Sequence, residues 1–177
     1  VRVVDTLSAS AGQGLLAMIA AEAAMEGMNA DEVGALLEHS IPQTRVFGVA
    51  DDLKYAVKGG RVPAWVKKVA DLLHLNPVLT ASKEGSVGVG GLHFGRGADP
   101  VQLARTVTGK MQGDTMYRVL ISHANNPEGA KVLRHDILSR HARIHSCHIT
   151  DAGPALGAHF GPGGLIGAFT PHPKVLK

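Results

Sequence analysis

The spacing of hydrophobic and polar positions predicts that helices and strands alternate along this chain. Short apolar or β-branched runs predict strands over 1–4, 45–49, 77–81, 87–94, 117–122, 144–149 and 165–169. Broader apolar surfaces with capping and proline signals predict helices over 11–27, 30–40, 51–58, 63–73, from 99–100 onward and over 126–140. Strands 77–81 and 87–94 form a predicted hairpin. Because βα units are combined with one hairpin, we expect an α/β fold with a mixed sheet.

The start of the chain carries the first candidate for chemistry. A predicted strand ends at Asp5, and the loop that follows presents the hydroxyls of Thr6, Ser8 and Ser10 before the predicted helix over 11–27. Free N–H groups and the positive dipole end of a helix N-terminus attract anions. This order of elements favours an anion site, although a serine-rich turn that simply caps the helix is also typical. The glycine spacing differs from GxGxxG, which disfavours a dinucleotide site.

A second candidate lies near the other end of the chain. The segment 153–164, GPALGAHFGPGG, gathers five glycines and two prolines around His159. Glycine permits positive φ and close backbone approach, while proline stiffens a turn. We expect a glycine-rich turn that presents the imidazole to a small polar group. The alternative is a turn whose histidine merely satisfies nearby backbone.

Composition narrows the class of protein. The 177 residues can bury a core as one domain, or as a small domain with part of another. A net charge of +3, few aromatic residues and no continuous basic run argue against nucleic-acid binding. Cys147 is the single cysteine, so an internal disulfide is impossible and a reducing, cytoplasmic location is expected. The most apolar stretch, 15–25, is interrupted by Glu22 and is too short for an integral membrane segment.

Two groupings of reactive side chains keep other chemistry open. Ser10, His159 and either Asp5 or Asp151 supply the residue types of a hydrolytic triad, so an acyl-ester hydrolase is an alternative, although no G-x-S-x-G elbow is present. A zinc site is suggested by the crowding of His135, His141, His145, Cys147 and His148. Neither CxxC nor HExxH spacing occurs, so ordinary surface and core histidines, with no metal, are the better interpretation.

The most cationic local region follows the predicted strand 45–49. It contains Lys54, Lys58, Arg61, Lys67 and Lys68. A solvated helix face is the simplest interpretation, and a docking surface for an acidic partner is the functional one. Arg61 is the best single candidate for the second, because it follows Gly59 and Gly60, which can direct it toward a cleft.

Four motifs occur in one order along nearly the whole chain. They are D-T-L-S-A-S-A-G-Q-G at 5–14, L-K-Y-A-V-K-G-G-R-V at 53–62, L-N-P-V-L-T at 75–80 and G-P-A-L-G-A-H-F-G-P-G-G at 153–164. With them the chain resembles the DegV family of fatty-acid-binding proteins. The resemblance implies a two-domain α/β fold with mixed β-sheets flanked by helices, holding one long-chain fatty acid between the domains. It also implies a non-catalytic partner, without a cofactor, that presents the acyl carboxylate to a dihydroxyacetone-kinase-like fatty acid kinase.

The same resemblance assigns roles to particular residues. It places the fatty-acid carboxylate at Ser10 and His159, with Ser8 and Thr6 close by. The residues on the head-group side, or at the kinase docking surface, are Gly59, Gly60 and Arg61. The residues that shape the histidine loop are Gly157, Gly161, Pro162 and Gly163.

The sequence departs from the family pattern at several positions. Thr6 stands where serine is usual, Asn76 where lysine is common and Phe160 where threonine is usual. The segment 91–99 also lacks the customary basic–threonine–basic sequence. These departures leave a third class open, a regulatory domain that has lost its ligand.

The beginning of the chain differs from the family as well. It starts at Val1, within a predicted strand and without the family's earlier strands and S-G-T-type loop. We therefore expect the first domain to be incomplete here, with a missing N-terminal segment of the same protein completing the site. Residues 1–50 would be the remainder of that N-terminal α/β domain, and 51–177 the C-terminal α/β domain.

Overall fold

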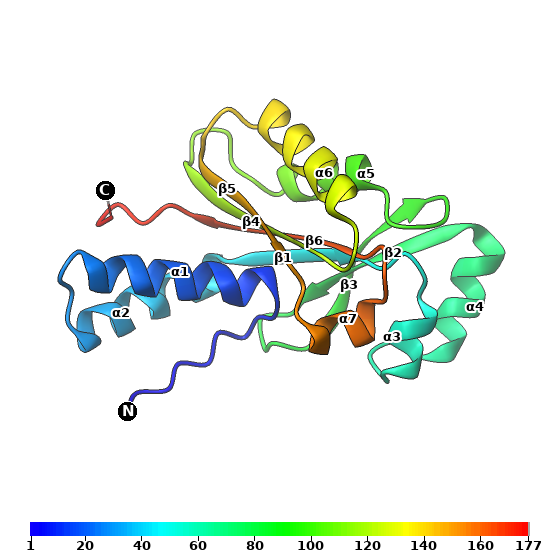
Figure 1. The fold of residues 1–177 in the computed structure, drawn as a ribbon, viewed down its shortest axis with the longest axis horizontal. Coiled ribbons are helices and arrows are strands. Elements are labelled where there is room, and N and C mark those ends of the chain that lie inside the picture. The colour runs from blue at the N-terminus through cyan, green and yellow to red at the C-terminus, as the bar shows by residue number, and fades with distance from the viewer. Residues whose placement is uncertain (177) are drawn as a thin grey trace.

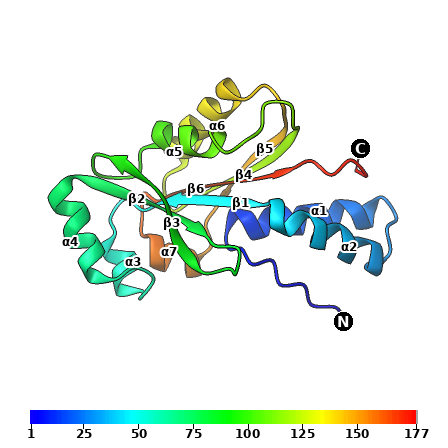
Figure 2. The same cartoon turned by 180° about the vertical axis from the view of Figure 1, so that it is seen from behind.

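The structure, a computed structural model, describes residues 1–176 and is built around one sheet with helices on both faces (Figures 1 and 2). The strands are β1 (Arg45–Val49), β2 (Leu75–Ala81), β3 (Val87–Phe94), β4 (Tyr117–His123), β5 (Ile144–Asp151) and β6 (Leu165–Pro171). The helices are α1 (Ala11–Met25), α2 (Ala30–Ser40), the 3₁₀ turn η1 (Ile41–Gln43), α3 (Lys54–Lys58), α4 (Ala64–Leu73), α5 (Pro100–Thr108), α6 (Pro127–Arg140) and α7 (Pro154–Phe160). Among the helices of residues 1–176, none combines the length and apolar character that a bilayer crossing requires.

The sheet is mixed, with the strand order β3-β2-β1-β6-β4-β5. β4 and β5 are parallel and are connected through α6, whereas the other neighbouring strands are antiparallel. β2 and β3 form the predicted hairpin. The predicted α/β class, with a mixed sheet flanked by helices, is confirmed.

The two faces of the sheet carry different helices, as β4 illustrates. Val119 and Ile121 join the main core, to which α5 and α6 also contribute. Leu120, between them, joins a second cluster with Ala11 and Leu15 of α1. Because alternate side chains of a strand point to opposite faces, one strand serves both cores. In Figure 1, α5 and α6 lie above the sheet, and α1 and α7 lie below it.

An ion pair between a buried arginine on β4 and a partly exposed glutamate connects β4 to α1. Arg118 has a side chain that is 3% exposed, and its Nη1 contacts Oε2 of Glu22 on α1. The Nε of Arg118 also donates to Nδ1 of His172 at 2.8 Å. A buried guanidinium without a partner is costly, so this contact helps to fix where α1 lies along the strand. Nearer the helix start, a Cβ at Gly14 would lie 2.8 Å from Leu120 Cδ2, so helix and strand are in close contact there too.

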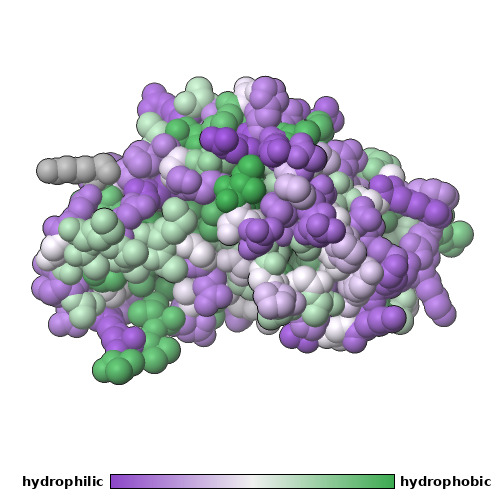
Figure 3. All heavy atoms as spheres, in the orientation of Figure 1, coloured by the Kyte–Doolittle hydropathy of each residue, from purple (hydrophilic) through white to green (hydrophobic). Residues whose placement is uncertain are grey.

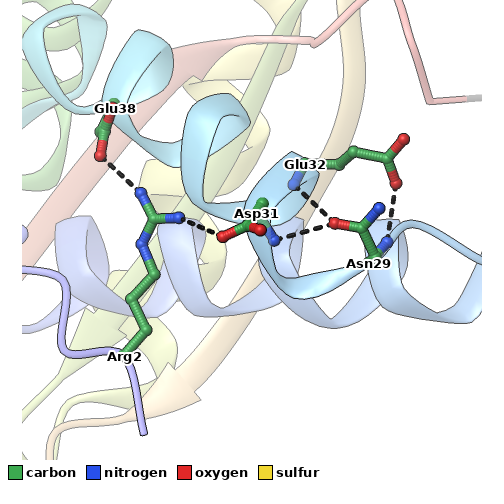
Figure 4. Close-up of polar contacts among 5 residues, drawn as sticks. All are labelled: Arg2, Asn29, Asp31, Glu32 and Glu38. Atoms are coloured by element: carbon green, nitrogen blue, oxygen red, sulfur yellow. Dashed lines mark hydrogen bonds and ion pairs between the residues drawn. The ribbon is translucent and has the colours of Figure 1, made fainter.

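The predicted strand over 1–4 is wrong. A strand needs a neighbour for its backbone N–H and C=O groups, and within residues 1–176 no strand pairs with this segment. Arg2 instead contacts Asp31 at 3.2 Å and Glu38 at 2.8 Å, both on α2 (Figure 4). The first valines of the segment are exposed, and apolar atoms project at the lower left of Figure 3, where Figure 1 marks the N-terminus.

The sheet crosses the expected domain division. β1 belongs to residues 1–50, whereas its two neighbours, β2 and β6, belong to 51–177. The division stays a prediction, and it would separate β1 from both strands that pair with it.

The capping box at the start of α2 generates a stability prediction. Asn29 Oδ1 accepts from the backbone N–H groups of Asp31 at 2.9 Å and Glu32 at 3.1 Å, and Glu32 Oε2 accepts from the N–H of Asn29 at 2.8 Å (Figure 4). Asn29→Ala removes this side-chain cap, so we expect the free energy of unfolding to fall by about 1 kcal/mol. Urea denaturation followed by circular dichroism measures it. Gln13→Ala, at an exposed position of α1, is the control, and an equal effect in both variants would contradict the prediction.

Candidate functional site

A cavity of about 490 Å³ lies between the N-terminal end of α1, helices α3 and α7, and the sheet. Strands β1, β2 and β6 contribute to its wall, together with the start of β3. Most of the lining is apolar, with the larger side chains being Val46, Leu79, Val87, Leu156, Phe160 and Ile166. The polar side chains in the lining are Ser8, Ser10, Arg61, Thr80 and His159. The cavity is therefore an apolar space with a few polar groups, the usual character of a small-molecule site.

Ser10 stands at the N-terminal end of α1 in an unusual conformation. Its φ is 54° and its ψ is −128°, and its side chain makes no capping hydrogen bond to the helix. The hydroxyl instead lies 2.8 Å from the Oγ of Ser122 on β4. Positive φ in a residue other than glycine costs free energy and occurs often at functional sites. Local packing, rather than helix capping, thus decides where this hydroxyl points.

The other two predicted hydroxyls differ in their relation to the cavity. Ser8 lines it, and a Cβ added at Gly12 would overlap the Ser8 hydroxyl, so that hydroxyl occupies the space beside the first turn of α1. Thr6 is outside the lining and its Oγ1 donates to the backbone oxygen of Ser8 at 3.3 Å. Thr6 therefore braces the loop, and its predicted contact with a carboxylate stays a prediction.

His159 lies on α7, in a segment that was expected to be a turn. Pro154 occupies the first turn of the helix and Gly161 follows its last residue, positions where these residues favour helix starts and ends. Because glycine is typical of turns, the glycines of this segment predicted a turn and not this short helix. Within the described chain, the buried Nδ1 of His159 has no hydrogen-bond partner. This nitrogen is one of the polar groups that the protein itself leaves unsatisfied.

The glycine-arginine turn after α3 lies against the histidine. A Cβ added at Gly59 would overlap Nδ1 of His159, so the ring can sit there because this residue has no side chain. Gly60 follows with a φ of 71°. Arg61 lines the cavity, and its Nη1 donates to the backbone oxygen of Gly59 at 2.7 Å. The turn therefore lies against His159, and its predicted place on the head-group side or at a docking surface stays a prediction.

The remaining predicted glycines and proline shape the chain around α7 without lining the cavity. The N–H of Gly161 donates to the oxygen of Gly157 at 2.8 Å, which ends the helix. A Cβ at Gly161 would overlap the ring of Tyr55 on α3, so this glycine allows α7 to pack against α3. Pro162 is exposed, and Gly163 continues the turn with a φ of 90°.

The two aspartates considered for a hydrolytic triad contact groups other than His159. Asp5 Oδ1 accepts from the N–H of Leu7 at 3.0 Å, and Asp151 lies 3.6 Å from Nδ1 of His123. Ser10 pairs with a serine, so within residues 1–176 no hydrogen bond links it to an imidazole. The geometry gives no support to a hydrolytic triad.

Two of the candidate zinc ligands, His141 and His145, contact other groups, and a third, Cys147, is buried as a neutral thiol. His141 Nε2 lies 3.1 Å from the oxygen of Gln112, and His145 stacks on His172 with ring centroids 3.9 Å apart. Burial raises the pKa of the Cys147 thiol to about 11, so it is a thiol rather than a thiolate at neutral pH. In the part of the chain that is described, no group of three or more His, Cys, Asp or Glu side chains is placed to hold a metal.

Ser122 is the site residue that the sequence reasoning missed. It lies inside β4 and is 2% exposed, and its neighbours in sequence are apolar residues and a histidine. A serine at the end of the apolar run 119–121 is a weak signal, because its partner is fixed by the packing of α1 and not by local sequence.

The model of the family described as "Uncharacterised protein, DegV family" matches residues 1–170. The chain belongs to the DegV family. Among curated relatives, a DegV domain-containing protein of Streptococcus pyogenes is 30% identical over 165 residues, covering 93% of this chain and 56% of the relative. A second, from Clostridium acetobutylicum, is 28% identical over 169 residues, covering 93% of this chain and 57% of the relative. The chain therefore spans somewhat more than half the length of these DegV relatives.

Solved DegV structures share the fold. A fatty-acid-binding DegV protein of Streptococcus agalactiae is 27% identical with a TM-score of 0.78, and the match covers 97% of this chain and 60% of that one. The fatty acid kinase (Fak) B3 protein of Streptococcus pneumoniae, solved with linoleic acid, is 20% identical with a TM-score of 0.82, covering 97% and 60%. The predicted family is thus confirmed, and the predicted fold agrees with these structures over nearly the whole chain.

The contact between Gly59 and His159 generates a prediction about side-chain placement. In Gly59→Ala the new methyl group overlaps the imidazole, so the ring must move, and we expect a loss of about 1–3 kcal/mol in the free energy of unfolding. Imidazole ¹⁵N–¹H NMR correlations report the displacement of His159 directly. Gly88→Ala, where a Cβ meets nothing within 4 Å, is the matched control. Unchanged His159 resonances in Gly59→Ala would show that the packing is looser than the structure has it.

Proposed function

We propose that the cavity binds a long-chain fatty acid with its carboxylate at the end marked by Ser10 and His159. The observation that carries this proposal is that these two residues, from opposite ends of the sequence, line one apolar cavity. A DegV relative from Streptococcus agalactiae is described as fatty acid binding, which supports the same ligand class here. The imidazole of His159 and the hydroxyl of Ser10 both belong to residues that line the cavity, and each is a group from which a carboxylate can accept a hydrogen bond.

The tail and the carboxylate of such a ligand make different contributions to the free energy of binding. Burying about fourteen methylene groups contributes on the order of 11 kcal/mol. Each hydrogen bond to a charged carboxylate contributes only about 1.5–3 kcal/mol. Association costs of roughly 4–15 kcal/mol oppose both. The tail therefore supplies most of the affinity, and the polar residues decide which end of the ligand faces them.

We also propose that the bound acid is presented to a fatty acid kinase, with the kinase supplying the chemistry that forms the acyl phosphate. The cationic region beside the cavity supports this. Lys54 pairs with Asp52 at 2.9 Å, which raises the pKa of that lysine, and Lys67 pairs with Asp71 at 2.7 Å. Within residues 1–176, Lys58 and Lys68 form no ion pair, so their charges are available to an acidic partner.

The head-group assignment predicts a selective loss of acid binding. We expect Ser10→Ala and His159→Ala each to weaken binding of tetradecanoic acid about tenfold, because each removes one hydrogen bond to a charged group. Binding of tetradecan-1-ol, which carries no charge, changes less. Displacement of a fluorescent fatty acid measures both affinities.

Two further variants control for effects on the tail. Val46→Trp places a large ring in the cavity and is expected to abolish binding of acid and alcohol together, whereas Leu92→Trp, exposed on β3, leaves both intact. If Ser10→Ala and His159→Ala both bind the acid like the unaltered protein, the head-group assignment is wrong.

The docking proposal predicts a loss of turnover without a loss of binding. The double variant Lys58→Glu with Lys68→Glu reverses two exposed charges, so we expect a several-fold fall in acyl-phosphate formation with a fatty acid kinase and ATP. Fatty-acid affinity stays the same. Lys110→Glu with Lys174→Glu changes two exposed lysines that form no ion pair within residues 1–176 and do not line the cavity, and it is the matched control. Equal turnover in the two double variants would reject this docking surface.

A further inference from the structure

Ser122 occupies a buried position directly behind Ser10. It is 2% exposed, does not line the cavity, and its Oγ lies 2.8 Å from the Oγ of Ser10. On β4 it lies on the face that also carries Leu120, toward α1, and it pairs across the sheet with Ile166, which does line the cavity. A buried hydroxyl needs a partner, and Ser10 is the partner that the structure provides.

The Ser10 hydroxyl contacts Ser122 in place of the usual capping hydrogen bond to the helix. A serine at a helix N-cap ordinarily accepts from a backbone N–H of the first turn, with its own backbone extended. Here the backbone has a φ of 54° and the capping hydrogen bond is missing. The space beside the first turn is taken by the hydroxyl of Ser8, which a side chain at Gly12 would overlap. The contact with Ser122 is therefore what holds the Ser10 hydroxyl in its place.

The number of hydroxyl hydrogens determines which of the two serines is the donor in their hydrogen bond. Each serine hydroxyl has one hydrogen to donate, and one hydrogen lies in the bond between the two oxygens. If Ser10 donates to an anion in the cavity, then Ser122 must be the donor to Ser10. An anion thus selects one order, with Ser122 donating to Ser10 and Ser10 donating to the anion. An alcohol can both donate and accept, so it imposes no such order.

We propose that Ser122 is a positioning residue, which holds the Ser10 hydroxyl away from the helix end and directs its proton to an anionic head group. This inference rests on the proposed fatty-acid site and adds to it a source of selectivity for acids over neutral lipids. Ser122 acts through Ser10 and does not touch the ligand. Without Ser122, no hydrogen bond holds the Ser10 side chain in this orientation, and its donation to the carboxylate is weakened.

The test compares an acid and an alcohol of equal chain length. In Ser122→Ala we expect affinity for tetradecanoic acid to fall about fivefold or more, and affinity for tetradecan-1-ol to change less than about twofold. The pKa of bound [1-¹³C]tetradecanoic acid, followed by NMR, rises because a hydrogen bond that favours the charged form is weakened. Ser122→Thr keeps the hydroxyl and restores both values. Ser40→Ala removes another buried hydroxyl, whose Oγ donates to Leu36 at 2.8 Å away from the cavity, and leaves both unchanged.

The outcomes separate this inference from the function on which it rests. Equal weakening of acid and alcohol in Ser122→Ala, or an unchanged acid pKa, overturns the positioning role while the fatty-acid site stands. Failure of Ser122→Thr to restore the acid preference also overturns it. If the unaltered protein binds neither tetradecanoic acid nor tetradecan-1-ol, the proposed function fails first, and the inference fails with it.

Discussion

The position of α1 along β4 is the constraint on which the rest of the site depends. Three successive residues on one face of β4 meet α1. Arg118 pairs with Glu22 toward the end of the helix, Leu120 packs near its first turns, and Ser122 meets Ser10 at its start. Sliding the helix by one turn would shift it by about 5.4 Å along the strand, so the ion pair and the hydroxyl contact would both be lost. The ion pair of Arg118 with Glu22 toward one end of α1 thus contributes to the location of the hydroxyl at the other.

The second half of the site depends on close packing around α7. Phe160 lies against Gly48 and Gly164, where an added Cβ would come within 2.8 Å and 3.1 Å of its ring. His159, the preceding residue, lies against Gly59. Glycines at these contacts allow α7 to approach both the sheet and the turn after α3. The imidazole is therefore carried on a short helix fixed on two sides, which is a more rigid support than the turn expected from the sequence.

Local sequence signals predicted most elements and failed where long-range packing decides. The strand over 45–49 has the predicted bounds, because its apolar run is buried in the sheet. Residues 1–4 have the same β-branched character but lack a pairing strand within the described chain, so they form none. In 153–164 the glycines predicted a turn, although proline and glycine also stand at the ends of a helix. Ser10 was identified through its motif, whereas Ser122 emerges only when α1 is placed on β4.

Asn76 and Phe160, two departures from the family pattern, take part in packing and do not fill the cavity. Asn76 is 5% exposed, and its Nδ2 donates to the backbone oxygens of Ala50 at 2.9 Å and Gly97 at 2.7 Å. An amide with two hydrogens can thus join the end of β1 to the loop before α5, a task for which the charge of a lysine is unnecessary. Phe160 fills the space between three hydrophobic clusters and still borders the cavity of about 490 Å³. Neither residue closes the cavity, so both are compatible with the proposed fatty-acid site.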